Sequence, residues 1–376
     1  ILAYNTHYNA FYANMAMNEM FIDSAVKRES VVSIAKLLNY TPRSIRSSAA
    51  AITVTVNNVI GSPSSLSIAS YTPFTTTING SSYTFYNLEP ATIIPVGGVY
   101  SYSALDIFEG TFVSNKFDVV TPGPAEKYII PNAGIDTSTI RVTVQDSPTS
   151  SVSEAFTLFA GDITTVTELS TIYFLDQNPS GFYEVYFGDG VLGQKLIAGN
   201  RVTIEYLVSN GTDANISDKV AQTFTLTGSI GGYSDATIVV DSKSTSGQDQ
   251  ETIDEIRFNA PKYATAQNRL ITKYDYEAFL KRNYSYISSV SIWGGEDNDP
   301  PQYGKVFISV VPKAGQFLTS TRKAKITTDI KEQRALAITP AFVDPEIFYV
   351  NVATVIKYNP NKTNESATDI QTAVQA

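Results

Sequence analysis

The spacing of apolar residues changes twice along the chain, and these changes constrain the fold more than any other feature. Residues 8–39 repeat apolar side chains every three or four positions, as amphipathic helices do. From residue 50 the period is two, which is typical of half-buried strands. Helical spacing returns at about residue 250. With 376 residues, the chain exceeds one ordinary hydrophobic core, so we expect several domains.

The expected fold class is a multidomain, β-rich α+β protein with central antiparallel β domains. Its C-terminal domain is expected to be of the split β-α-β, ferredoxin-like type and incomplete. The chain begins at Ile1 without an initiator methionine and ends inside an expected helix, so we expect a fragment of a longer polypeptide. The expected parts are an N-terminal helical segment (1–48), a β-rich region (49–248, with subdomains of about 49–120 and 121–248), a helical connector (249–286) and the C-terminal domain (287–376).

The N-terminal segment is predicted to form two helices. A one-sided stripe on the first is predicted from residues four and seven apart: Phe11, Met15, Ile22 and Val26. We favour core packing for this stripe over an exposed partner-binding surface, although methionine adapts well to partners. The chain's three methionines all lie here: Met15, Met17 and Met20. Ser30 is the expected N-cap of the second helix, which ends before Pro42.

Local signals place the other elements. Asn79-Gly80 predicts a tight hairpin between strands 75–78 and 83–86, because both residues tolerate a positive φ angle. Capping patterns begin helices at Thr252 and Thr272, and Pro261 is expected to interrupt the first of them. Further strands are expected at 51–56, 111–120, 126–130, 139–145, 183–187, 202–208, 287–293, 304–311 and 346–357, with helices at 321–336 and from 365.

Composition excludes several functions. There is no cysteine, which excludes disulfides, thiolate metal sites and a cysteine nucleophile, and the single histidine, His7, argues against a triad or a histidine-rich metal site. The formal net charge of −9 argues against a broad nucleic-acid-binding face. No run of eighteen uncharged apolar residues is present. We therefore expect no catalytic residues, cofactor, metal, nucleic acid, membrane or small-molecule substrate.

Two loops carry clustered polar or glycine residues. The acidic loop 296–299 could offer oxygen ligands to calcium, but its spacing is not that of an EF-hand, and a solvated loop is favoured. Residues 187–194 hold three glycines around Asp189, in neither a dinucleotide-binding nor a P-loop pattern. We expect a turn in which Asp189 accepts hydrogen bonds from nearby backbone amides.

Several stretches together resemble the baseplate J-like family, the wedge proteins of contractile phage tails and related injection machines. The most specific is the strand 183–187 followed by a Gly-Asp-Gly turn, a Gly-bearing loop and the strand 202–206. The turn residues that match are Gly188, Asp189, Gly190, Gly193 and Gly199. Residues 31–43, 253–261, 269–276 and 293–312 also match, in the family's order.

The resemblance implies a non-enzymatic structural component of a phage tail baseplate, assembled in the host bacterial cytoplasm and carried in the virion. It implies that the chain links wedges into a ring around the hub and changes conformation when the sheath contracts. Its partners would be itself, as a dimer or ring, and other wedge and hub proteins. We expect ring contacts from residues 8–39 and 287–376, a hinge at Pro261, and interface residues Phe11, Met15, Met17, Met20, Phe21, Trp293, Arg322 and Lys325.

Two other interpretations remain open at this stage. The chain could be a receptor- or carbohydrate-binding β-rich protein of a tail fibre or adhesin, using its 23 tyrosines and 19 phenylalanines and the acidic loop 296–299. It could also be a hydrolase with paired carboxylates, of which Asp106 and Glu109 are neighbours in sequence. Neither has an identifiable motif.

Overall fold

The structure is a computed structural model. It describes residues 2–346 except 39, 121, 124–125, 160–165, 179, 217–219, 267–268, 285, 314–316 and 332. The described helices and strands lie in the first of two compact units, Ile1–Asp344. The strand expected at 346–357 and the helix expected from 365 lie outside the described residues, apart from residue 346.

The first β unit is a six-stranded antiparallel sheet that curls until its edge strands β14 and β15 touch. The short pair β2 (Leu66–Ile68) and β5 (Ala91–Ile93) packs against the same core. The predicted hairpin is confirmed: Asn79 and Gly80 both have positive φ, and Ile78 pairs with Ser81. In sheet order the strands are β14 (Thr225–Leu226), β3 (Pro73–Ile78), β4 (Ser81–Tyr86), β6 (Tyr100–Glu109), β1 (Ala49–Val56) and β15 (Ala236–Thr245).

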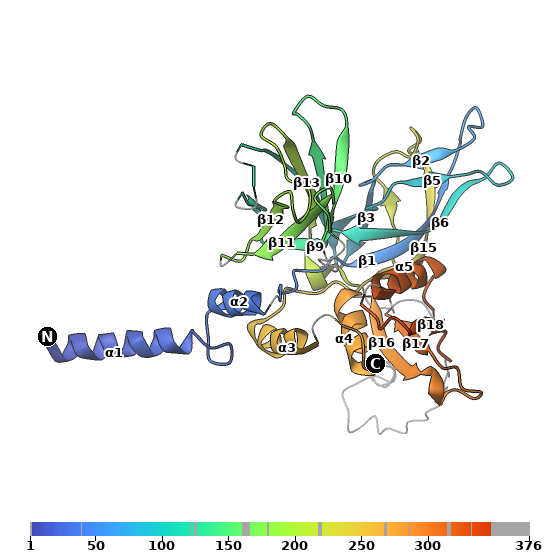
Figure 1. Cartoon of the computed structure of the whole chain (residues 1–376). Helices are drawn as coiled ribbons and strands as arrows, with labels where there is room; N and C mark the ends of the chain where they lie inside the picture. Colours follow the sequence, from blue (N-terminus) through green and yellow to red (C-terminus); the bar gives the residue numbers. More distant parts are fainter. Residues whose placement is uncertain are drawn as a thin grey trace, which may run out of the picture. The chain divides into compact units, whose positions relative to one another are not determined.

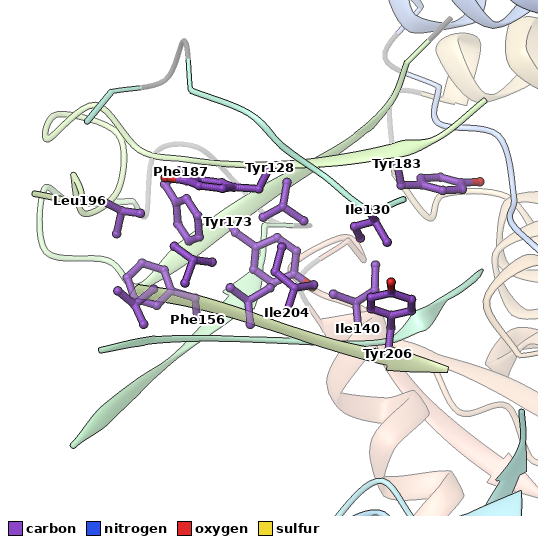
Figure 2. Packing of buried hydrophobic residues seen from close by; sticks show 14 of the residues in the cluster. Tyr128, Ile130, Ile140, Phe156, Tyr173, Tyr183, Phe187, Leu196, Ile204 and Tyr206 are labelled. Carbon is purple, nitrogen blue, oxygen red and sulfur yellow. The ribbon is translucent and has the colours of Figure 1, made fainter. Parts of the chain in front are cut away.

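The second β unit is a seven-stranded sheet that also curls on itself. Phe117 on one edge strand and Tyr128 on the other lie 5.5 Å apart between ring centroids. Figure 2 shows the buried side chains that fill this unit, with the Tyr128, Phe156, Tyr173 and Phe187 rings converging between the strands. Its strands are β7 (Thr111–Asp118), β13 (Arg201–Val208), β9 (Ile135–Gln145), β10 (Ser153–Leu158), β11 (Ile172–Gln177), β12 (Tyr183–Phe187) and β8 (Tyr128–Ile129).

The second unit is inserted into the first. Strands β14 and β15 follow the whole second unit in sequence, yet they belong to the first sheet (Figure 1). The expected subdomains of about 49–120 and 121–248 therefore divide differently in space: β7 belongs to the second sheet, and residues 225–245 belong to the first. The physical reason is the long-range pairing of β1 with β15, which local sequence patterns do not reveal.

Four helices flank the β units: α1 (Leu2–Asn18), α2 (Arg28–Leu37), α3 (Ile253–Ala266) and α4 (Lys273–Asn283). Both predicted capping boxes are present, since Thr252 and Thr272 each accept from the amide three residues on. The N-cap prediction for Ser30 is wrong, because the N-cap of α2 is Lys27, three residues earlier. The expected interruption at Pro261 is also wrong, because α3 continues through it.

The described C-terminal elements are an antiparallel pair, a helix and a parallel strand. β16 (Ile287–Gly294) pairs with β17 (Lys305–Pro312), and β18 (Thr339–Val343) adds in parallel to β17. Helix α5 (Ser320–Lys331) connects β17 to β18 and buries Ile326 and Ile330, which were predicted to lie one turn apart. This is a β-α-β connection, and its last strand, β18, lies before the strand expected at 346–357 and was not predicted.

Glu251 fastens the N-terminal segment to α3. Its side chain is almost fully buried, and its two carboxylate oxygens accept from the Tyr40 hydroxyl (2.6 Å), the Arg43 amide (2.8 Å) and the Asn259 amide group (2.7 Å). Its backbone carbonyl accepts from Arg28 at 2.5 Å. A buried carboxylate with this many donors holds several chain segments together.

We predict that Glu251→Ala lowers the free energy of unfolding by about 3 kcal/mol, because it leaves buried donors without an acceptor. Urea unfolding followed by circular dichroism measures this. The matched control is Asp254→Ala, whose carboxylate is 88% exposed and which should change stability by no more than about 0.5 kcal/mol. Equal effects of the two substitutions would contradict this role for Glu251.

Candidate assembly surface

Helix α1 presents large apolar side chains that no other part of the described chain buries. None of its 17 residues is buried. Tyr4 is 70% exposed, Phe11 is 58% exposed and even Met15 keeps 39% of its surface. Exposed apolar side chains are ordinary singly, but a continuous group of them marks an interaction site.

Leu2 and Met17 lie elsewhere on α1, but its other five large apolar side chains share one face. Their spacing of three and four residues places them within about one third of the helix circumference. Successive tyrosine rings contact each other, with centroid distances of 6.1 Å between Tyr4 and Tyr8 and 6.5 Å between Tyr8 and Tyr12. We call this group the α1 stripe: Tyr4, Tyr8, Phe11, Tyr12 and Met15. Helix α1 contains no Lys, Arg, Asp or Glu, so its stripe is uncharged throughout.

The predicted stripe of Phe11, Met15, Ile22 and Val26 does not pack together in a core: only Ile22 contacts a buried cluster, and the other three are exposed. The turn after α1 explains why. The helix ends at Asn18, and the Glu19 carboxylate accepts from the Val26 amide at 3.0 Å and from the Lys27 amide. Hydrogen bonds from Ser30 and from these amides hold the pKa of Glu19 below its usual value. The chain therefore turns between 19 and 27, and Ile22 and Val26 do not continue the helical stripe.

The other predicted residues at the end of α1 and after it have different environments. Met17, Met20 and Phe21 are each at least 60% exposed, whereas Ile22 packs against the buried cluster formed by α2 and α3. Arg257 of α3 donates to the backbone carbonyls of Ile22 and Ala25, which fixes this turn. The turn that follows α1 is thus attached to α3, and it holds the C-terminal end of the helix that carries the stripe.

The C-terminal residues predicted for an interface are largely engaged within the chain. Arg322 donates to Asp106 of β6 at 2.7 Å and lies over the Tyr286 ring. Trp293 stacks on Phe307 with centroids 5.8 Å apart and donates to Asn298. Only the Lys325 side chain is mostly exposed, at 69%, and it pairs with Asp329. The structure therefore brings together the α1 residues of the predicted set, but does not add these three to the stripe.

The glycine-rich turn is built as expected. Asp189 accepts from the amides of Val191 (2.9 Å) and Leu192 (2.8 Å), and these bonds keep the pKa of Asp189 below its usual value. Gly190, Gly193 and Gly199 all have positive φ. A Cβ at Gly188 would lie 2.4 Å from backbone atoms of Leu192 and Gly193. Asp189 therefore closes a structural turn.

The two carboxylates considered for hydrolysis do not face a common cleft. Asp106 pairs with Arg322, while buried Glu109 accepts from Ser209 and from the backbone and side chain of Asn210. Burial raises the pKa of Glu109 despite these donors. In the part of the chain that the structure describes, no three histidine, cysteine, aspartate or glutamate side chains gather as a metal site requires.

Comparisons with known proteins bear on the whole chain. Residues 272–343 match the family model described as baseplate structural protein gp6, C-terminal domain I. The chain is also 26% identical, over 399 aligned residues, to baseplate wedge protein gp6 of Enterobacteria phage T4. It resembles a phage baseplate wedge protein. The alignment covers 97% of this chain and 57% of that relative, so the chain spans little more than half the relative's length.

A solved structure is also similar over most of the chain. The anti-feeding prophage baseplate, determined by cryo-EM, matches with 14% identity and a TM-score of 0.27, covering 86% of this chain and 62% of that one. At that TM-score the likeness adds nothing to the argument. Within the described residues, no helix has the length and apolar character needed to cross a membrane.

Sequence reasoning found part of the α1 stripe and missed the rest. Phe11 and Met15 were predicted as interface residues, whereas Tyr4, Tyr8 and Tyr12 were not. A signal was available, because these three tyrosines follow one another at intervals of four residues. Their hydroxyl groups made them resemble ordinary surface residues.

The packing of the Gly-Asp-Gly turn can be tested by substituting its first glycine. We predict that Gly188→Ala costs about 2–3 kcal/mol of stability, because the new Cβ meets rigid backbone. Gly199→Ala is the control: its φ is unfavourable, unlike that of Gly188, but nothing lies within 4 Å of its Cβ, and it should cost about 1 kcal/mol. Urea unfolding midpoints measure both, and a larger loss for Gly199→Ala would refute the tight-turn explanation.

Proposed function

We propose that this chain is a structural component of a contractile phage tail baseplate, carried in the virion. The observation that carries the proposal is the similarity to a baseplate wedge protein along 97% of the chain, joined by the family match at 272–343. The molecule's construction supports it: two barrel-like units and helical elements present an uncharged aromatic stripe. Such a component acts by binding its neighbours.

The α1 stripe is the proposed assembly surface. Interface cores are depleted of charge and enriched in tyrosine, phenylalanine and methionine, which is the composition of α1. A helix with anchors at i, i+4, i+7 and i+11 is suited to an apolar groove between other helices. Met17, Met20 and Phe21 extend the apolar surface beyond the stripe.

The proposed partners are other wedge and hub proteins and a second copy of this chain, together forming a ring. An uncharged helix also suits association of chains that each carry a net charge of −9, because like charges do not meet at the contact. Within the ring, α3 carrying Pro261 is the proposed hinge when the baseplate switches. The C-terminal domain would supply the second ring contact through Trp293, Arg322 and Lys325.

Finer structural assignments belong to the same proposal. The turn at 188–193 and the strands around it support membership of the wider baseplate J-like family. The β16, β17, α5 and β18 arrangement is compatible with an incomplete split β-α-β domain over 287–376. The helical segment 1–48 and the connector 249–286 stay as proposed parts on either side of the β-rich region in sequence, and α2 and α3 join them in one buried cluster.

Replacing stripe residues should prevent assembly without unfolding the protein. We predict that Tyr8→Ser combined with Phe11→Ser weakens association with the other wedge proteins of the same baseplate at least about tenfold, because both rings are central and exposed. Multi-angle light scattering of the chain mixed with those proteins across a concentration series measures the complex. Circular dichroism verifies that the variant keeps its helix content.

The matched control is Tyr303→Ser, which alters an 80% exposed tyrosine outside the stripe and should leave association unchanged. Full association of the double variant would show that the stripe is not the assembly surface. Failure of the unaltered chain to join any wedge complex would count against the baseplate role itself.

A further inference from the structure

Tyr71 has a backbone conformation that a bulky residue rarely adopts. Its φ is +59°, in the left-handed region that favours glycine. It lies between β2 and β3 of the first β unit. A tyrosine keeps this conformation only where contacts with the surrounding structure offset the strain, and residues strained in this way concentrate at switch regions.

The loop around Tyr71 is locked by one buried side chain. Asn87 accepts from the Thr72 amide through its side-chain oxygen at 2.9 Å, and its backbone carbonyl accepts from the Tyr71 amide at 2.7 Å. Its side-chain amide donates to the carbonyls of Ala69 and Glu89, both at 2.8 Å. Three of these hydrogen bonds hold the backbone of residues 69–72 in the strained shape, and the fourth, to Glu89, fixes the Asn87 side chain.

The Tyr71 ring packs against the second β unit, and we call this contact between the two units the seam. Its centroid lies 4.1 Å from that of Phe112 on β7, and the Arg141 guanidinium of β9 lies 5.8 Å from the ring centroid. The Glu89 carboxylate pairs with the same Arg141. The first unit thus contacts the second through the Tyr71 ring, which packs on Phe112 and Arg141. It also contacts it through the Glu89 carboxylate, which pairs with Arg141.

The Tyr71 hydroxyl is a second unusual feature. It is buried and has no hydrogen-bond partner among the residues that the structure describes. Burial, followed by the nearby Glu205 charge, raises the pKa of Tyr71, so the hydroxyl stays neutral. An unpaired buried hydroxyl costs free energy, and that cost is removed when the ring leaves the seam and meets water.

We infer that Tyr71 is a strained clamp that fixes the angle between the two β units and can release them. In the closed state its ring is wedged against Phe112 and Arg141. On release, its backbone returns to an ordinary extended conformation and its hydroxyl becomes hydrated. We place the turning point at Gly110, where the chain passes from the first unit to the second. There the two units stay joined, because Glu109 accepts from Ser209 and Asn210, and a Cβ on Gly110 would lie 2.9 Å from the Val208 carbonyl oxygen. The seam is therefore built to switch between two arrangements.

The test measures the distance between the units in the full chain. Because the sequence has no cysteine, Ser82→Cys on β4 and Ala155→Cys on β10 give two clean spin-label positions, both exposed. Pulsed electron–electron double resonance then reports the distribution of distances between the two spin labels. Tyr71→Gly removes the ring and the backbone strain. We expect the distance distribution of this variant to become about twice as wide or to move to a different mean distance. Tyr71→Phe keeps the ring and should leave the distribution narrow.

Tyr303→Gly is the matched control, because it makes the same change at an exposed turn and should not alter the distribution. An unchanged distribution in Tyr71→Gly would overturn the clamp. If that variant does not fold, Glu89→Gln weakens the same seam through its exposed side, where the Glu89 side chain is 82% accessible. Broadening in Glu89→Gln would then support the clamp, and a parental distribution would overturn it.

Discussion

The pairing of β1 with β15 is the interaction on which the rest of the structure depends. It joins Ala49–Val56 to Ala236–Thr245 and closes the first sheet after the whole second unit has been inserted. The same pairing brings the segment before β1 beside the segment after β15, where Arg46 and Gln248 form a bridge. That neighbourhood positions Glu251 under Tyr40 and Arg43, and thereby attaches α2 to α3. Helix α1 is presented from this firmly held base.

This architecture separates rigidity from association. The two curled sheets have their own buried cores, whereas α1 contributes no side chain to any of them. Stability therefore does not depend on the aromatic rings of α1, and those rings are available to a partner. A wedge component needs this combination, because it must be stable before assembly and must then bind through contacts that several chains share.

Local signals predicted local structure well. Asn79-Gly80, the Thr272 cap and the turn at Asp189 were correctly predicted because neighbouring residues alone decide them. The insertion of the second unit was not predicted, since no local pattern in β15 indicates that its pairing strand lies about 190 residues earlier. Of the α1 stripe only Phe11 and Met15 were found, and core packing was favoured for them, because periodicity shows which residues share a face and not what covers it. Tyr71 gave no signal, since its unusual φ angle is imposed by Asn87 and the second unit.

Hydrogen–deuterium exchange of the α1 amides, in the free chain and in the assembled wedge, tests the central claim most directly. A helix without buried residues opens locally in the free protein, so its amides should exchange much faster than those of β1. The account predicts that assembly protects α1 strongly and leaves β1 unchanged. Exchange at α1 that stays as fast in the assembled wedge as in the free chain would contradict it.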